Sequence, residues 1–197
     1  MNIWQEIYSA DEYVYGVQPN EFLLEHYELF KGSKKLATFA EGEGRNAVFL
    51  STKGYMLTNF DYAQHGLDKS RKLASINHVH VASRLVDLTK DDTPVNEFDG
   101  AVMIFGHFPK KYQKLVFDKI IASVKAGGYI LMELYSEEQV NYASGGPKDR
   151  DMLFNSNDIQ KWCSPFKMVH FSVGEVERHE GIRHNGKSHV IQFIIKK

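Results

Sequence analysis

The fold of this chain is decided by the stretch Leu36-Ala37-Thr38-Phe39-Ala40-Glu41-Gly42-Glu43-Gly44-Arg45-Asn46-Ala47, which is followed by a second apolar run and then Asp61. The pattern predicts a buried strand over 35–39, a glycine turn, and a helix over 46–53 that ends at Gly54. Glycines let the backbone approach a ligand closely, and a helix N-terminus offers unpaired N–H groups. An acid after the next strand accepts hydrogen bonds from ribose hydroxyls. This order predicts a site for a cofactor that contains a nucleoside.

The composition limits the classes of protein to consider. A chain of 197 residues is long enough for one domain with a real core, and its net charge of -1 argues against a general nucleic-acid binder. The single cysteine, Cys163, excludes an internal disulfide. The N-terminal residues do not follow the pattern of a signal peptide, and the apolar runs are too short to span a membrane. We therefore expect one cytoplasmic domain over 1–197 that binds neither nucleic acid nor membrane.

Apolar strands alternate with amphipathic helices along the rest of the chain. Further strands are predicted over 55–60, 79–82, 98–105 and 129–134, and helices over 21–30, 68–76, 112–124 and 157–163. Such alternation predicts an α/β fold with a doubly wound, mostly parallel sheet covered by helices on both faces. Residues 168–176 and 189–195 flank a glycine-rich connection at 181–186, which predicts an antiparallel C-terminal hairpin. The long loop over 136–151 is expected to carry function.

The glycine turn alone leaves the cofactor open. Gly42-x-Gly44-x-x-Ala47 also fits the dinucleotide fingerprint, so an NAD-dependent oxidoreductase stays an alternative. Three features favour a different cofactor. Asp87 follows the third strand, where it can accept a hydrogen bond from an adenine amino group. The turn Lys125-x-Gly127-Gly128 leads directly into a buried strand, and the closing hairpin leaves no second domain for hydride transfer.

In this order and spacing, the motifs resemble those of class I S-adenosylmethionine-dependent methyltransferases over almost the whole chain. The similarity is strongest to the small group that includes tellurite-resistance and thiopurine methyltransferases. The residues that carry it are Trp4, Tyr13 to Gly16, Pro19-Asn20-x-Phe22-Leu23, Gly42-Glu43-Gly44-Arg45-Asn46, Phe49-Leu50, Gly54-Tyr55, Asp61, Gly66-Leu67-x-Lys69, Phe98-Asp99, Phe105-Gly106-His107 and Lys125-x-Gly127-Gly128.

The resemblance implies a Rossmann-like sheet of seven strands with the last strand antiparallel, and S-adenosylmethionine as cofactor. It also implies a cofactor site whose members bind the methionine half, the ribose, the adenine and the amino group: Ala40, Glu41, Gly42, Gly44, Arg45, Asp61, Tyr62, Asp87, Leu88, Phe105 and Gly106. Three positions depart from the family pattern. Ala40 replaces the usual first glycine, Thr38 stands where an acid is common, and Ala126 replaces a proline. Glu41 is the candidate substitute for the missing acid, and Arg45 either binds the cofactor carboxylate or pairs locally.

The resemblance further implies transfer of a methyl group to a small molecule. A soft sulfur, selenium or tellurium nucleophile would need little deprotonation, whereas an oxygen or nitrogen nucleophile would use a base, for which His107 is the candidate. Because of the altered loop, a protein that binds the cofactor without turnover also stays open. Residues 1–33 are expected to form a lid over the core at 34–197. No metal is expected, and the chain is expected to be a monomer or weak homodimer. The candidate substrate residues are aromatic: Tyr13, Tyr15, Phe108, Tyr135 and Tyr142.

Overall fold

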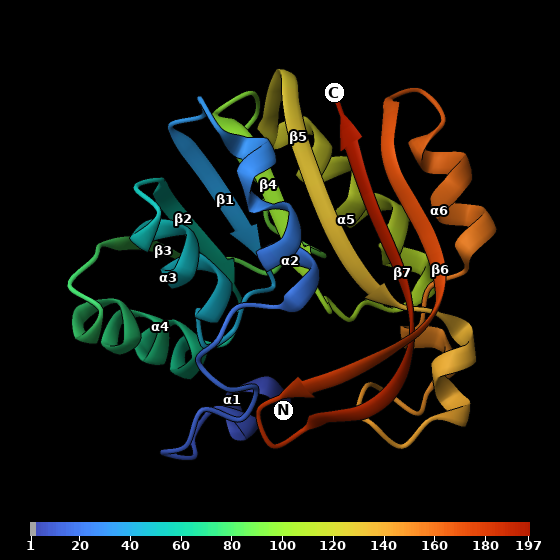
Figure 1. Cartoon of the computed structure of the whole chain (residues 1–197), viewed down its shortest axis with the longest axis horizontal. Coiled ribbons are helices and arrows are strands. Elements are labelled where there is room, and N and C mark those ends of the chain that lie inside the picture. The colour runs from blue at the N-terminus through green and yellow to red at the C-terminus, as the bar shows by residue number, and fades with distance from the viewer. Residues whose placement is uncertain (1–2) are drawn as a thin grey trace.

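The computed structural model describes residues 3–197, which form one seven-stranded sheet between two layers of helices (Figure 1). The strand order is β3-β2-β1-β4-β5-β7-β6. The first five strands pair in parallel, and β7 runs antiparallel to both β5 and β6. The predicted fold class is confirmed. The strands are β1 (Lys35–Phe39), β2 (Met56–Asp61), β3 (Val81–Leu85), β4 (Phe98–Ile104), β5 (Val124–Tyr135), β6 (Lys167–Glu180) and β7 (His184–Lys196).

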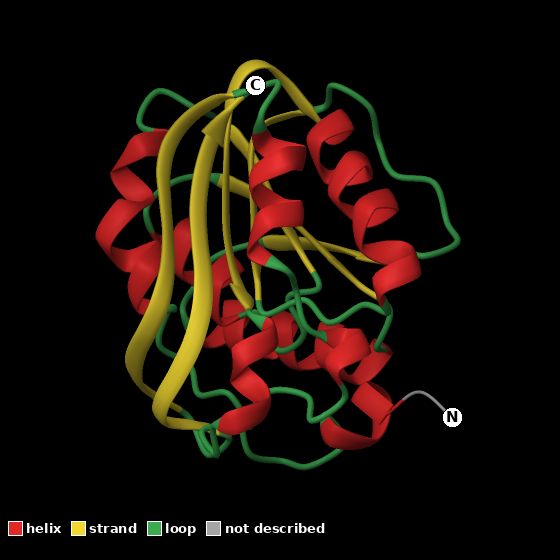
Figure 2. Ribbon diagram, turned by 90° about the vertical axis from the view of Figure 1, so that its right-hand side faces the viewer, coloured by secondary structure: helices red, strands yellow, loops and turns green. Residues whose placement is uncertain are grey.

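Each face of the sheet has its own hydrophobic core. Successive residues of a strand point to opposite faces, so Leu36 joins one core while Ala37 joins the other. Figure 2 shows helices on both sides of the sheet. One core includes residues of α5 (Lys110–Ser123) and α6 (Ser156–Cys163). The other includes residues of α2 (Glu21–His26), α3 (Arg45–Thr52) and α4 (Gln64–Ile76). The near-continuous apolar sequence of β4 follows from burial on both faces.

Several segments differ from the sequence prediction. The structure adds a short helix, α1 (Ile3–Ile7), and the 3-10 helices η2 (Glu137–Asn141) and η3 (Arg150–Met152). The helix predicted over 21–30 is divided into α2 and the 3-10 helix η1 (Tyr27–Phe30). Helix α4 begins four residues earlier than expected, at Gln64. Within residues 3–197, no helix has both the length and the apolar character needed to cross a membrane.

The C-terminal hairpin is longer than predicted, and its turn is tighter. The last paired residues are Glu180 and His184, so the turn covers 181–183 instead of 181–186. Strand β7 first pairs with β5 at Val190, opposite Tyr135. The preceding residues of β7 therefore project beyond the carboxyl ends of the parallel strands, as Figure 1 shows. There the backbone N–H of Ile182 donates to the carbonyl oxygen of Val14 at 2.9 Å, which joins the hairpin tip to the N-terminal segment.

Candidate active site

A cavity of about 290 Å³ lies at the carboxyl ends of β1 to β4. In open α/β sheets, ligands bind at this edge, where the strand order reverses. Residues that follow all four strands line the cavity, together with the N-terminal aromatic side chains of Trp4 and Tyr8. A second, smaller cavity of about 40 Å³ is adjacent to the first, because the two share five lining residues: Trp4, Tyr8, Ala40, Phe105 and His107.

The glycine loop is shaped by the contacts of Gly42 and Glu41. Gly42 has a left-handed φ of 60°, and a Cβ atom there would clash with the hydroxyl group of Tyr8. The Oε1 atom of Glu41 accepts hydrogen bonds from the N–H groups of Asn46 at 2.7 Å and Ala47 at 3.1 Å, so this side chain caps the start of α3. Burial raises the pKa of Glu41 to about 7, against these hydrogen bonds. Glu41 also lines the smaller cavity.

Asp61 ends β2 and faces the larger cavity. Its two carboxylate oxygens accept hydrogen bonds from the N–H groups of Gly42 at 2.7 Å and Ala63 at 2.8 Å. These bonds fix the orientation of the carboxylate, and each oxygen has a second lone pair for a ligand hydroxyl. Burial raises the pKa of Asp61 to about 6, and the backbone hydrogen bonds partly oppose this effect. The carboxylate is therefore an oriented acceptor at neutral pH.

The residues after β3 form another wall of the larger cavity. Val86 and Leu88 contribute apolar surface, and Asp87 lies between them. Asp87 Oδ1 accepts from the backbone N–H of Thr89 at 3.0 Å and from its hydroxyl group at 2.6 Å, while Oδ2 pairs with Lys90 at 2.7 Å. Burial raises the pKa of Asp87, but these hydrogen bonds outweigh it and hold the pKa below its usual value. Tyr62, Gly106 and Phe108 line the same cavity, as the sequence predicted.

Two strand ends carry backbone strain. Ala40 after β1 and Phe105 after β4 have left-handed φ values of 49° and 52°, which L-residues adopt at a cost of roughly 1–2 kcal/mol. Both residues line both cavities. Such strain persists only where the surrounding structure enforces it, and it clusters at functional sites. The left-handed backbone also explains why the family pattern has glycine at position 40.

Arg45 does not simply pair locally, because its partner comes from the C-terminal hairpin. Its Nη2 atom lies 2.6 Å from Oε2 of Glu180, and both side chains are buried. The Nη1 atom of Arg45 is also buried but has no hydrogen-bond partner among residues 3–197. Arg45 lines the smaller cavity. An unpartnered guanidinium nitrogen at this position suits an anionic group of a ligand.

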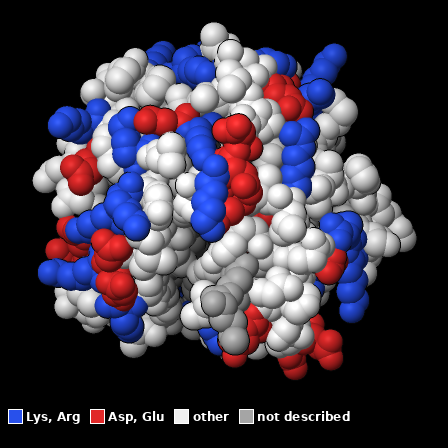
Figure 3. Space-filling view, turned by 180° about the vertical axis from the view of Figure 1, so that it is seen from behind, with Lys and Arg blue, Asp and Glu red and all other residues white. Residues whose placement is uncertain are grey.

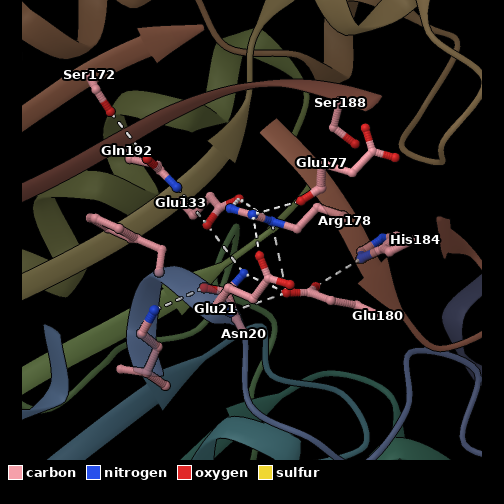
Figure 4. Close-up of polar contacts among 12 residues, drawn as sticks. Asn20, Glu21, Glu133, Ser172, Glu177, Arg178, Glu180, His184, Ser188 and Gln192 are labelled. Carbon is pink, nitrogen blue, oxygen red and sulfur yellow. Dashed lines mark hydrogen bonds and ion pairs between the residues drawn. The ribbon is translucent and has the colours of Figure 1, made fainter. Parts of the chain in front are cut away.

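A network of buried charges holds Glu180 in place (Figure 4). Arg178 pairs with Glu133 at 2.7 Å, and the exposed fraction of the Glu133 side chain is 0%. Asn20 donates from Nδ2 to Glu133 at 3.2 Å and to Glu180 at 3.0 Å. The network therefore connects the N-terminal segment, β5, β6 and, through Arg45, the start of α3.

Two imidazole rings line the smaller cavity. His107 stacks against Trp4, with ring centroids 5.5 Å apart, and against Tyr135 at 5.9 Å. Removal from water, with a smaller effect of His184, lowers the pKa of His107 to about 3, so this ring is neutral. His184 begins β7 and packs on Tyr15, with ring centroids 4.4 Å apart. Its Nδ1 atom lies 3.7 Å from Glu180.

Five of the predicted site residues lie outside both cavities, and one of them is Gly42, which packs against Tyr8. Tyr13 and Tyr142 are turned away: the Tyr13 hydroxyl donates to the carbonyl oxygen of Lys69 at 3.0 Å, and that of Tyr142 donates to Glu175 at 2.7 Å. Tyr135 is buried and stacks beneath Phe105, with ring centroids 4.3 Å apart. Gly44 packs closely against Ser70 of α4, where a Cβ atom would clash, so this glycine is required for helix packing.

Sequence reasoning missed four residues that shape the site. Trp4 and Tyr8 had a weak signal in the aromatic N-terminal segment, and both line the two cavities. Glu180 and His184 lie beside and within the connection predicted at 181–186, where a solvated turn was the favoured interpretation, so the sequence did not select them. The structure brings Tyr15 to the smaller cavity, as predicted.

Comparison with known proteins places this geometry in a family. The model of the family "Tellurite resistance protein TehB" matches residues 1–195. The chain belongs to the TehB family. Its family and fold are those of class I S-adenosylmethionine-dependent methyltransferases, and S-adenosylmethionine is the expected cofactor.

The individual relatives share little sequence identity with this chain. The chain is 28% identical over 125 residues to a tRNA (uracil(54)-C(5))-methyltransferase of Pyrococcus horikoshii, a match that covers 56% of this chain and 30% of the relative. The chain thus spans less than a third of that relative's length. TehB from Haemophilus influenzae has a similar structure, with a TM-score of 0.71 and 14% identity over 98% of this chain and 65% of that one.

A second similar structure comes from work on the "Conversion of a Disulfide Bond into a Thioacetal Group during Echinomycin Biosynthesis". Its TM-score is 0.77, with 10% identity over 99% of this chain and 91% of that one. At such low identities, the two solved structures establish the fold alone.

Proposed function

We propose that this protein methylates a small molecule through a soft sulfur, selenium or tellurium atom, with S-adenosylmethionine as the methyl donor. The observation that carries the proposal is the pair of adjacent cavities at the carboxyl edge of the sheet, one with an oriented carboxylate and one with two imidazole rings. The family description, which names tellurite resistance, supports a heavy chalcogen as acceptor.

The residues of the larger cavity fit the cofactor. The lone pairs of Asp61 that its backbone bonds leave available suit ribose hydroxyls, and the apolar surfaces of Val86 and Leu88 suit an adenine ring. Arg45 Nη1, which has no protein partner among the described residues, suits the carboxylate of the methionine half. Side chains around the two adjacent cavities thus suit both the nucleoside and the amino-acid end of the cofactor.

The chain's own contribution is to orient the acceptor and exclude water. When bound, the cofactor supplies a methyl group on a positively charged sulfur, which is already electrophilic. Trp4, Tyr8 and Phe105 surround the junction of the two cavities, and their ring faces favour a nearby positive charge. Confinement of two aligned reactants can lower a barrier by roughly 7–11 kcal/mol. For a soft nucleophile, such alignment supplies most of the catalysis that the reaction needs.

The acceptor is small for two reasons. The two cavities measure about 290 and 40 Å³, and the acceptor has to share this space with the cofactor, which leaves room for a small group. On the face shown in Figure 3, Lys and Arg side chains are interspersed with Asp and Glu, whereas nucleic-acid binders gather basic side chains into a patch. A nucleic-acid substrate, as the name of the Pyrococcus relative suggests for that protein, is therefore the less favoured reading.

Calorimetry and a turnover assay test the proposal. We expect the demethylated cofactor product to bind, NAD not to bind, and the product to be released with a thiol or selenide but not with transfer RNA. The Asp61→Asn variant is the matched control for the cofactor site, and it should bind the demethylated product more weakly than wild type while staying folded. Binding without turnover on any acceptor would instead support a silent cofactor-binding protein. Stabilisation by NAD alone would refute the proposal.

A further inference from the structure

The smaller cavity is lined by a histidine, His184, whose surroundings suit a general base. We propose that His184, oriented by Glu180, receives the proton of a protic acceptor, such as a thiol, as the methyl group is transferred. This inference rests on the function proposed above and adds a catalytic residue and a substrate class, an acceptor that is still protonated at neutral pH.

The position of His184 allows contact with an acceptor. Its side chain is 5% exposed and lines the smaller cavity, where it packs between the rings of Tyr15 and Phe105 at centroid distances of 4.4 and 4.8 Å. Nδ1 faces Glu180 across 3.7 Å and has no hydrogen-bond partner among residues 3–197. With Nδ1 directed at the carboxylate, Nε2 is the nitrogen left for the acceptor.

Glu180 can stabilise a positive charge on His184. Arg45 at 2.6 Å and Asn20 at 3.0 Å fix the Glu180 carboxylate, which is buried. Burial favours the neutral acid, but His184 and Arg45 outweigh it and hold the pKa of Glu180 at about 2. The carboxylate therefore stays ionised throughout the working pH range.

The other groups around His184 keep it neutral until an acceptor arrives. Burial lowers its pKa, Glu180 raises it, and the positive charges of Arg45 and Arg178 lower it again. His107 faces the same cavity and is itself neutral, and burial raises the pKa of Tyr15 to about 12, so its hydroxyl stays protonated. His184 is thus the neutral imidazole with a carboxylate behind it. His107 instead stacks between Trp4 and Tyr135 and has no such carboxylate among its described neighbours.

The proposed step is balanced. The acceptor sulfur forms a bond to the methyl carbon, and the electron pair of the breaking carbon–sulfur bond returns to the departing sulfur, which becomes an uncharged thioether. The proton of the acceptor thiol passes to Nε2 of His184 and then to water. No oxidant or reductant is needed.

The test compares a thiol with the selenol of the same carbon skeleton, because the selenol is already ionised at neutral pH. In His184→Gln, we expect turnover of the thiol to fall by about 100-fold, as for loss of a general base, and turnover of the selenol to fall less than threefold. Raising the pH above the pKa of the thiol should restore much of the loss. The matched control is His179→Gln, an exposed histidine of the same hairpin that lines neither cavity.

One readout does not depend on turnover. In the protein alone, the NMR titration of the His184 ring should move to lower pH in Glu180→Gln, because the carboxylate that favours the charged ring is gone.

Equal losses with the thiol and the selenol, or an unchanged titration of the His184 ring in Glu180→Gln, would overturn the inference and leave His184 a packing residue. If the wild-type protein does not bind the demethylated product at all, the proposed function fails instead. Binding of that product by His184→Gln, with an unchanged melting temperature, shows that the variant is folded.

Discussion

The two halves of the site are held in different ways. The glycine loop and Asp61 are fixed by short-range backbone hydrogen bonds, such as that from Gly42 to Asp61 at 2.7 Å. The hairpin half is fixed by buried charges from distant segments, such as the pair of Arg45 and Glu180 at 2.6 Å. In the first half, burial raises the pKa values of Glu41 and Asp61, and backbone hydrogen bonds oppose this effect only in part. In the second half, buried carboxylates are paired with Arg45 and Arg178, so their stability depends on these partners being in place.

The largest expected effect is loss of stability at the hairpin half. In Arg178→Met, Glu133 would be left buried and unpaired, so we expect the free energy of unfolding to fall by about 3–5 kcal/mol in urea denaturation. The control is Lys114→Met on α5, whose exposed pair with Asp118 should be worth less than about 1 kcal/mol. Equal effects of the two substitutions would mean that the network is not what distinguishes the two halves.

The contribution of the loop half to the free energy of unfolding should depend on pH. The folded-state pKa values of Glu41, about 7, and Asp61, about 6, lie above those of the unfolded chain. The folded protein therefore binds protons more readily, and this part of its stability is present at low pH and lost as the pH rises from about 4 to about 7. Glu41→Gln should be more stable than wild type at pH 8 by on the order of 2–3 kcal/mol, and the difference should vanish near pH 4. A constant difference across this range would contradict the assignment.

Asp61→Asn separates binding from stability. The amide keeps the shape but loses the charge that hydroxyl donors favour, so we expect the demethylated product to bind about 10- to 100-fold more weakly by calorimetry. Because the asparagine Nδ2 group cannot accept a hydrogen bond, the N–H group of Gly42 or Ala63 loses its acceptor, so the variant should stay folded but melt a few degrees lower than wild type. In wild type, binding should also weaken below pH 6, where Asp61 takes up a proton, and in the variant this dependence should be absent.

The smallest effect concerns the strain at Ala40. Glycine adopts a left-handed φ of 49° without cost, so Ala40→Gly should raise the free energy of unfolding by about 0.5–1 kcal/mol. The control is Ala47→Gly within α3, which should lower it by about 1 kcal/mol. If both variants are destabilised equally, the strain at the end of β1 does not affect the free energy of unfolding.

Sequence alone determined the α/β class, the order of the elements and the position of the glycine loop opposite Asp61. These features depend on contacts between neighbouring elements, since β1, α3 and β2 all lie within residues 35–61. The parallel pairing of β1 with β2 then places the two strand ends side by side. The amphipathic period of each segment and the glycines were sufficient for this part of the prediction.

The tertiary structure alone decided which distant residues complete the site. Arg45 and Glu180 are 135 positions apart, and they meet because β7 inserts between β5 and β6 and carries the hairpin beyond the sheet edge. No local pattern encodes this, because Glu180 and His184 read as turn residues until both strands are known to extend to them. The same limit applies to Trp4 and Tyr8, whose place at the larger cavity depends on packing between elements that are far apart in the chain, such as the contact of Tyr8 with Gly42.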